Sequence, residues 1–219
     1  MYNLLFFYLI KKMGSDYSLY GKKLNNPLFP IIAIDKRFLF PNAKIFYLQG
    51  GDCCDDPGIQ DNNGNSYFKI KGIALSPRKI IYDSHNKPLF NIDKEFFSFS
   101  YILKSGESDQ VIANVDKNGF FTSSKFNCTF KNLSTGLNDY IEIKSANYQN
   151  FFGVYQGKEK NGAPLICKIY KNPDLDCCSS SNFIIEIAPN IDVSLMLGLA
   201  LIFRDYSESS NNSSSSTTN

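Results

Sequence analysis

The residue types that most often carry enzyme chemistry are sparse in this sequence. Histidine occurs once, as His85, between Asp83 and Lys87 in a stretch with the composition of a turn. A general base must lie within hydrogen-bonding reach of the proton that it removes, usually in a pocket that tunes its pKa. We therefore interpret His85 as a solvated turn residue, with a role as general base as the alternative.

The motifs of the common catalytic frameworks are also missing. The 219 residues contain no glycine-rich phosphate-binding loop, no G-x-S-x-G elbow and no H-E-x-x-H helix. Carboxylate pairs such as Asp93 and Glu95 are interpreted as solvated charges at the end of a strand. We expect a protein that is not an enzyme and that uses no cofactor.

The cysteines offer a second kind of chemistry. They are Cys53, Cys54, Cys128, Cys167, Cys177 and Cys178, and no two have the C-x-x-C spacing of a structural zinc site. Cys128 and Cys167 alternate with polar neighbours, which favours a place in the core. We interpret all six as reduced, mostly free thiols in a cytosolic protein. The alternative is disulfide formation in a secreted protein, where the sequons at Asn127 and Asn132 would also matter.

An acidic segment is the remaining candidate for metal chemistry. Residues 50–65 read GGDCCDDPGIQDNNGN and contain Asp52, Asp55, Asp56 and Asp61. The order of these residues does not match that of an EF-hand loop. We interpret the segment as a long solvated loop inserted in the domain, with calcium binding as the alternative, and predict no metal site.

Composition and charge set the broad class. Hydrophobic residues make up 43% of the chain, enough for a sizeable core, and aromatic residues make up 15%. The formal net charge is +2, from 23 basic and 21 acidic residues. A nucleic-acid-binding domain is usually strongly basic, so we expect no nucleic-acid partner.

The elements that would position any site are mostly strands. Phe126, Cys128 and Phe130, for example, alternate with polar residues, as in a strand with one buried face. Similar strand signals occur at residues 31–34, 44–48, 67–71, 79–82, 89–92, 97–103, 111–115, 141–144, 165–170 and 183–187. Evenly spaced turn signals separate them, so the pattern predicts a meander of antiparallel hairpins.

Some of these hairpins echo one another. Phe68, Phe90 and Ile112 each follow a turn, and they are spaced by 22 residues, since 90 − 68 and 112 − 90 both equal 22. This spacing predicts one hairpin per repeat. The alternative is the ordinary regularity of hairpins.

One segment breaks the strand pattern. Residues 193–203 read VSLMLGLALIF and would be apolar on every side of a helix. Asn190 or Asp192 can cap its first turn, and Arg204 and Asp205 mark where the chain leaves the core. Crossing a bilayer takes about 20 residues. We therefore expect a helix threaded through a closed β-structure, with no transmembrane span.

Several of these segments, in this order, resemble the LURP-one-related family. Residues 75–76, 79–83 and 88–92 resemble the first hairpins of the family, and residues 184–196 resemble its closing strand, Ala-Pro turn and helix. The resemblance covers roughly residues 31–206. It implies a mainly β fold, a closed antiparallel barrel of about twelve strands around a central apolar helix. Such a fold is similar to the C-terminal domain of Tubby and, more remotely, to phospholipid scramblases.

The domain organisation follows from these patterns. We expect an N-terminal extension at residues 1–28, a barrel domain at 29–206 with the loop insertion 50–65, and a disordered Ser/Asn-rich tail at 207–219. The apolar run at the start of the extension is too short to span a bilayer and makes a poor signal peptide. Were translation to start at Met13, Gly14 would fit the myristoylation pattern, and the sequence leaves the start codon open.

The family resemblance implies a non-enzymatic binding module. Tubby-like domains bind phosphoinositides at a basic surface patch, and each Lys or Arg near an anionic membrane contributes about 1 kcal/mol. The candidate residues for an anionic lipid are Lys36, Arg37, Lys69, Lys71, Arg78 and Lys79. Solvated charges on the outside of a barrel are the alternative interpretation.

Partners and location are expectations of the same kind. We expect a cytoplasmic monomer, peripheral to a membrane if it binds anionic lipid, or else engaged with a protein partner in signalling or stress responses. The alternatives are a scramblase-like membrane-associated protein and a purely structural interaction domain.

Overall fold

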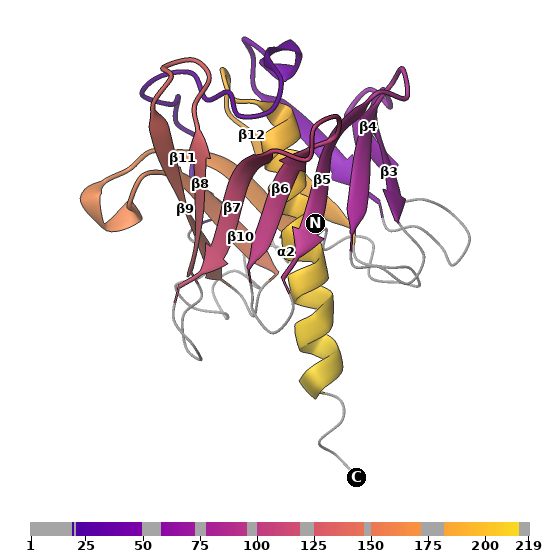
Figure 1. Ribbon diagram of the computed structural model, residues 1–219. Coiled ribbons are helices and arrows are strands. Elements are labelled where there is room, and N and C mark those ends of the chain that lie inside the picture. The colour runs from indigo at the N-terminus through magenta and orange to yellow at the C-terminus, as the bar shows by residue number, and fades with distance from the viewer. Residues whose placement is uncertain are drawn as a thin grey trace.

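In the part of the chain that the structure describes, twelve antiparallel strands form a closed barrel with a helix along its inside (Figure 1). The computed structural model describes residue 19 and residues 21–49, 58–72, 78–95, 100–118, 125–146, 150–171 and 182–214. Each strand pairs with the next in sequence, and β1 pairs with β12. The predicted fold class is therefore confirmed, and closure leaves none of these strands at an edge.

The strands are short and regular. They are β1 (Lys44–Leu48), β2 (Gly58–Asp61), β3 (Ser66–Gly72), β4 (Lys79–Asp83), β5 (Pro88–Lys94), β6 (Tyr101–Ser105), β7 (Val111–Lys117), β8 (Lys125–Lys131), β9 (Asn138–Ala146), β10 (Phe151–Gln156), β11 (Leu165–Lys171) and β12 (Phe183–Ile187). Two 3-10 helices, η2 (Lys36–Phe38) and η3 (Glu159–Asn161), and the helix α2 (Val193–Ser214) are also described.

Alternation places the predicted apolar faces inside the barrel. In β8, Phe126, Cys128 and Phe130 are buried. Thr129, which lies between the last two, is exposed. Most of the predicted strands follow this pattern, so hydropathy with a period of two located them correctly.

Three segments differ from the prediction. Residues 31–34 form only an isolated bridge, in which Ile31 pairs with Ile191. Residues 58–61, assigned to the long loop, form β2. β10 shows no alternation because both of its faces are buried. A preceding segment is tied to this part of the barrel, where the Asn25 amide donates to the Leu165 carbonyl oxygen at 2.8 Å.

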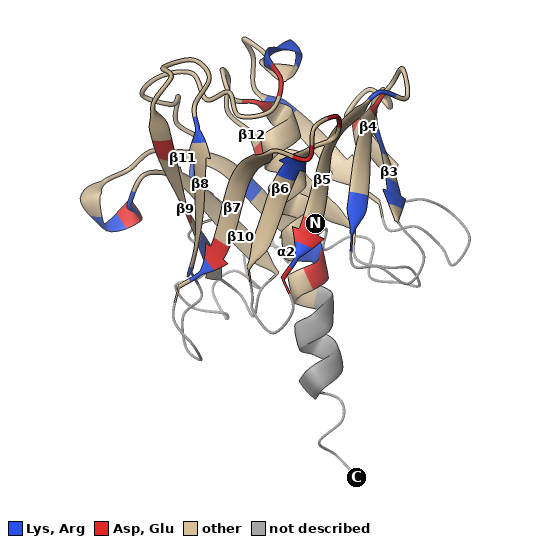
Figure 2. Cartoon of the chain, in the orientation of Figure 1, with Lys and Arg blue, Asp and Glu red and all other residues tan. Residues whose placement is uncertain are grey.

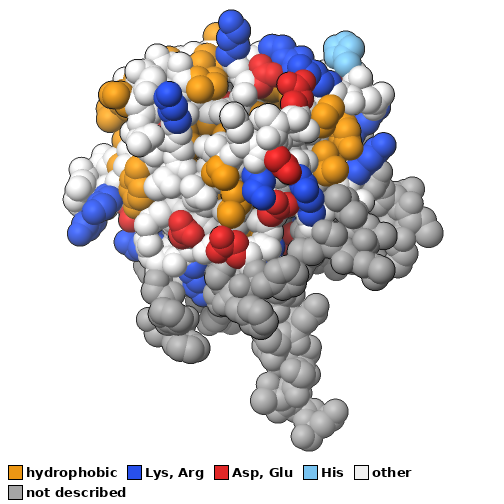
Figure 3. All heavy atoms as spheres, in the orientation of Figure 1, with side chains coloured by type: hydrophobic (Ala, Val, Ile, Leu, Met, Phe, Trp, Pro, Cys, Tyr) orange, Lys and Arg blue, Asp and Glu red, His pale blue; other side chains and the backbone are white. Residues whose placement is uncertain are grey.

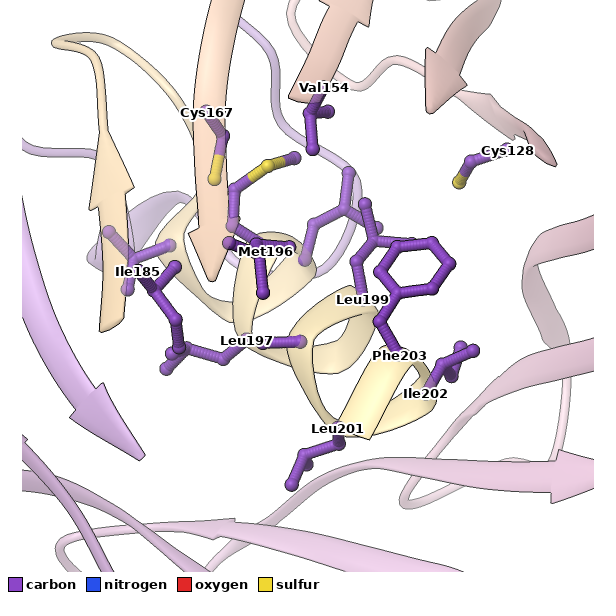
Figure 4. Close-up of a cluster of buried hydrophobic side chains, with 14 of the residues drawn as sticks. Cys128, Val154, Cys167, Ile185, Met196, Leu197, Leu199, Leu201, Ile202 and Phe203 are labelled. Carbon is purple, nitrogen blue, oxygen red and sulfur yellow. The ribbon is translucent and has the colours of Figure 1, made fainter. Parts of the chain in front are cut away.

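The helix α2 fills the barrel as predicted. Between Val193 and Phe203 every side chain that the apolar pattern singled out is at most 1% exposed. Figure 4 shows Met196, Leu199 and Phe203 among the side chains of the surrounding strands. The Phe203 ring stacks on that of Phe152, with centroids 4.4 Å apart. A Cβ on Gly198 would lie 3.1 Å from side-chain atoms of Leu103 and Phe90, so glycine permits this close approach.

A buried aspartate fixes the start of α2. Of the two predicted caps, Asp192 takes this role, and its Oδ1 accepts hydrogen bonds from the amide (3.0 Å) and hydroxyl of Ser194. Its Oδ2 accepts bonds from the amides of residues 33–35, at 3.1, 2.7 and 3.1 Å. Burial raises the pKa of the Asp192 carboxyl, while these hydrogen bonds oppose the rise. The carboxylate thus joins the helix to the N-terminal segment.

The helix runs further than the apolar pattern indicated. Burial continues past Arg204 to Ser207, and the Tyr206 ring packs edge-on against Phe126 at 5.0 Å. Helical structure reaches Ser214, so the first part of the predicted disordered tail is helical. Among the described residues, no helix combines the length and the apolar character needed to cross a membrane.

Several predictions concern residues outside the described part of the chain. These residues are Met13 and Gly14 of the extension, Asp52, Asp55 and Asp56 with Cys53 and Cys54 in the acidic segment, and Cys177 and Cys178. The predicted strand residues Phe97 and Phe99 and the end of the tail, residues 215–219, also lie there.

Candidate functional site

The two ends of the barrel differ. We call the end at which Asp192 caps α2 the capped end, and the end at which α2 leaves, near Asp205, the exit end (Figure 1). The turns after β2 and β4 lie at the capped end. There Asp61 accepts the amides of Asn63 and Asn65, and Asp83 accepts those of His85 and Lys87, all at 2.9 Å. The predicted basic residues divide between these ends and the barrel wall.

Lys36 and Arg37 lie on η2 at the capped end. Both are exposed, but Arg37 is held by two carboxylates, Asp35 at 2.7 Å and Asp83 at 3.2 Å. Burial raises the pKa of Asp83, but the amides of Lys87 and His85 and the guanidinium of Arg37 outweigh that effect and lower it. Arg37 therefore supports the Asp83 turn.

Lys69 and Lys71 share the outer face of β3. The Lys69 ammonium donates to the Asn86 side-chain oxygen at 2.8 Å, and that of Lys71 lies 5.4 Å from the centre of the Tyr82 ring. Both lysines are exposed, and within the described residues neither pairs with a carboxylate.

Arg78 and Lys79 have different environments. Arg78 contacts Asp109 at 2.6 Å and Asp93 at 3.4 Å, in a network that also contains Lys104. Figure 3 shows basic and acidic side chains interspersed on this face. Lys79 pairs with Asp205 of α2 and so marks the exit end. The six predicted residues therefore do not form one patch.

The exit end gathers lysines that the sequence analysis missed. Lys94 and Lys117 end β5 and β7, and Lys125 begins β8, close to the point where α2 emerges (Figure 2). With Lys71 and Lys79 they form what we call the basic arc. The sequence could have placed these lysines together, because in a meander the ends of odd-numbered strands and the starts of even-numbered strands lie at the same end of the barrel.

Aromatic rings and carboxylates hold parts of this arc. The Lys94 ammonium lies 5.9 Å from the centre of the Tyr101 ring, and the Lys117 ammonium lies 5.2 Å from that of Tyr206. Lys125 is 3.8 Å from Glu142. Rings attract the cation without cancelling its charge. Burial is the main cause that raises the pKa of Tyr101 to about 12, and the negative charge of the nearby Asp205 adds to it, so this phenol stays neutral.

Charge at the exit end is uneven. At this end, the strand ends of β3–β8 carry the five lysines of the arc and Arg78 against Asp93, Glu95 and Asp116, and the sequence of α2 adds Arg204, Asp205 and Glu208. The segments 73–77, 96–99 and 119–124, which connect the strands of the arc, contain no charged residue in the sequence. By contrast, the segments that follow β1 and β11 contain several aspartates. Positive charge is thus concentrated along β3–β8.

The comparisons with known proteins now identify the family. The sequence model of the LURP-one-related family matches residues 12–205. The chain belongs to the LURP-one-related family. Its fold matches that of an Arabidopsis thaliana protein solved by X-ray crystallography, with a TM-score of 0.56 and 15% identity over 80% of this chain and 98% of the other. The comparison with curated proteins finds no match.

The reactive side chains in the described part of this LURP-one-related barrel lie in structural positions. Cys128 and Cys167 are fully buried, and burial raises the pKa of the Cys128 thiol to about 12, so it stays protonated. His85 is exposed in the turn at the capped end, as predicted. Asp61 caps the β2–β3 turn, and no group of three or more possible metal ligands occurs in the described residues.

Proposed function

We propose that this LURP-one-related protein is a non-enzymatic binding module whose exit end docks on anionic phospholipid headgroups at a membrane surface. The observation that carries the proposal is the basic arc, five lysines along one side of one end of the barrel. Headgroup phosphates need several cations that converge from one direction. The exit end meets this requirement better than η2, where Asp35 and Asp83 hold Arg37.

Surface docking fits the barrel better than insertion of α2. The apolar side chains of Val193–Phe203 face the inside of the barrel, so they offer no apolar surface to lipid. Binding would therefore depend on charge. Charge interactions between exposed groups are screened over about 10 Å at 0.1 M salt, so added salt should weaken such binding.

The size of the effect follows from the three lysines of the arc that lie over aromatic rings. Lys71 and Lys94 contact rings rather than carboxylates, and Lys117 lies over the Tyr206 ring. At about 1 kcal/mol for each cation, these three contribute roughly 3 kcal/mol, which corresponds to about a 100-fold change in affinity. Charge reversal should remove this contribution and add repulsion.

Sedimentation with vesicles tests the proposal. Wild-type protein should bind vesicles of phosphatidylcholine with phosphatidylserine or phosphoinositide, more weakly as salt rises, and should ignore pure phosphatidylcholine. The variant Lys71→Glu/Lys94→Glu/Lys117→Glu should lose at least about 100-fold in affinity. Lys36→Glu/Lys131→Glu/Lys160→Glu has the same charge change on exposed residues at or near the capped end and serves as the matched control.

The control also separates the outcomes. If both variants lose binding equally, net charge rather than the arc is responsible. If neither loses it, the arc is not the site and another surface binds the vesicles. If the wild-type protein binds no anionic vesicles, the lipid proposal falls in favour of a protein partner. Circular dichroism of all variants must show the same strand content.

A further inference from the structure

The helix α2 does not end where it leaves the barrel. Figure 1 shows it continuing past the strand ends at the exit end, and its last residue is Ser214. Tyr206 and Ser207 are still buried among the side chains of the barrel. At a rise of about 1.5 Å per residue, residues 208–214 extend the helix by roughly 10 Å. These residues, which we call the projection, therefore lie beside the basic arc.

The projection is rich in serine. Residues 207–219 read SESSNNSSSSTTN, and Glu208 is their only charged residue. Serine and asparagine are weaker helix formers than alanine or leucine, so this end of α2 opens easily. A protein kinase binds its substrate serine in an extended segment, which a helix end of this composition supplies. Ser207 is 4% exposed and closed to such an enzyme, so Ser209 and Ser210 are the first candidates along the chain.

Helical register places Ser209 next to one lysine of the arc. Lys79 pairs with Asp205, which is four residues before Ser209 on α2. Residues four apart in a helix lie on the same face, with Cβ atoms about 5–6 Å apart. Ser209 therefore lies on the face of α2 that meets Lys79.

Ser210 has the same relation to a second lysine. It is four residues after Tyr206, whose ring centre lies 5.2 Å from the Lys117 ammonium. A phosphate on either serine would thus lie about one helical turn from a lysine that already contacts α2. At neutral pH each phosphate carries roughly −1.5 to −2 charges and three acceptor oxygens. Two phosphates would offset most of the positive charge of the five lysines.

We propose that Ser209 and Ser210 are phosphorylation sites that release the exit end from anionic membranes. The inference rests on the function proposed above, because a docked exit end holds the projection between the arc and the headgroups. In the modification, the serine oxygen forms a bond to the γ-phosphorus of ATP. The bond from that phosphorus to ADP breaks, and the hydroxyl proton passes to the base of a protein kinase. The new phosphates pair with lysines of the arc and repel the headgroups.

The first test needs no lipid. Phosphoserine is encoded genetically at positions 209 and 210, and the lysine side chains are labelled with carbon-13. The side-chain signals of Lys79 and Lys117 should shift relative to the unmodified chain, and the shifts should titrate near pH 6, about where the phosphate takes up a proton. Lys131, which ends β8 at the other end of the barrel, should keep its signal. Unmoved signals of Lys79 and Lys117 would refute the placement.

Phosphoserine one turn further along the helix is the matched control. Positions 213 and 214 repeat the spacing of four, so they lie roughly 12 Å along the axis from Asp205 and Tyr206. Charges on exposed groups are screened over about 8 Å at physiological salt. The control therefore adds the same charge to the chain but acts much less on the arc.

Sedimentation with the anionic vesicles described above then measures the release. Phosphoserine at positions 209 and 210 should weaken binding roughly 30-fold, the loss expected when two lysines no longer contribute. At positions 213 and 214 it should weaken binding less than about threefold. Ser209→Ala/Ser210→Ala should bind as the unmodified chain does, because neither hydroxyl is needed for docking.

The outcomes separate this inference from the function on which it rests. If the unmodified chain binds no anionic vesicles, both fall. If it binds, and the two phosphorylated forms lose affinity alike or not at all, docking stands and the release mechanism is refuted. Mass spectrometry of the protein from its own cells should find phosphate on Ser209 or Ser210, mainly in the fraction not bound to membranes. Unmodified serines in both fractions would also overturn the inference.

Discussion

Replacing Asp192 with asparagine should destabilise the protein by about 4 kcal/mol. The residue is completely buried, and its two carboxylate oxygens accept hydrogen bonds from the start of α2 and from the segment 33–35. Asparagine has the same shape but carries an NH₂ group in place of one oxygen. Whichever way the amide turns, that group faces N–H or O–H donors, so one side of the junction loses its acceptor.

The magnitude follows from these bonds. If the amide oxygen keeps the three bonds from residues 33–35, each falls from a charged to a neutral bond, a loss of about 1 kcal/mol apiece. The buried Ser194 amide then loses its acceptor, at about 1–3 kcal/mol. Relief from burying a charge returns part of this total. A net loss near 4 kcal/mol is a large share of the roughly 5–15 kcal/mol of a typical domain.

Urea unfolding measures the effect. The chain has 13 tyrosines and no tryptophan, so tyrosine fluorescence together with circular dichroism can follow the transition. Asp116→Asn, an exposed carboxylate on β7, is the matched control and should change stability by less than about 0.5 kcal/mol. A loss below about 1 kcal/mol for Asp192→Asn would refute the view that this carboxylate joins the helix to the barrel.

Two further predictions concern acid and the core. Burial raises the pKa of Asp83, yet the Lys87 and His85 amides and Arg37 lower it overall, below the unfolded value near 3.8. Its contribution to stability is complete above that value and disappears as pH falls through the folded pKa. The urea concentration at the unfolding midpoint should fall as the pH drops below about 4, and this fall should be less steep in Asp83→Asn. Leu197→Asp should abolish the cooperative transition, whereas Leu137→Asp, at a position that is 69% exposed, should retain it, and a folded Leu197→Asp would contradict the buried helix.

The sequence predicted the parts of the fold that follow from local hydropathy. The apolar run of α2 had to be enclosed on all sides, which together with the strand pattern predicted a helix threaded through a closed β-structure, while the barrel of about twelve strands was implied by the family resemblance. β10 was not predicted because both of its faces are buried, beside a strand to which the segment at Asn25 is tied, so it shows no alternation of buried and exposed residues. β2 was not predicted because it contains only four residues and lies within a stretch rich in turn residues.

The candidate site was predicted less well, for a physical reason. Basic residues can be found in a sequence, but their partners depend on the barrel's register and closure. Arg78 meets Asp109 from 31 positions away, and Lys79 meets Asp205 from 126 positions away. Local spacing does not indicate either contact. The sequence does contain one usable rule: in a meander, the ends of odd-numbered strands and the starts of even-numbered strands lie at the same end of the barrel. That rule would have found Lys94, Lys117 and Lys125.

The internal repeat shows how closely turn length controls which face is buried. Asp61, Asp83 and Ser105 are 22 residues apart, and each accepts backbone amides from the turn that follows it. After the first two turns the next strand begins five positions later, and Phe68 and Phe90 are buried. After Ser105 it begins six positions later, because the Ser105 amide bonds to the carbonyl of Gln110.

That extra residue has a definite consequence. Side chains alternate with a period of two, so an insertion of one residue moves the whole strand to the other face. In β7 the buried residues are Ala113 and Val115, while Ile112, which the spacing of 22 had matched to Phe68 and Phe90, faces outward and is half-buried. The repeat is therefore a repeat of turn caps at the capped end, and the identity of the core residues follows from it only while the turns keep one length.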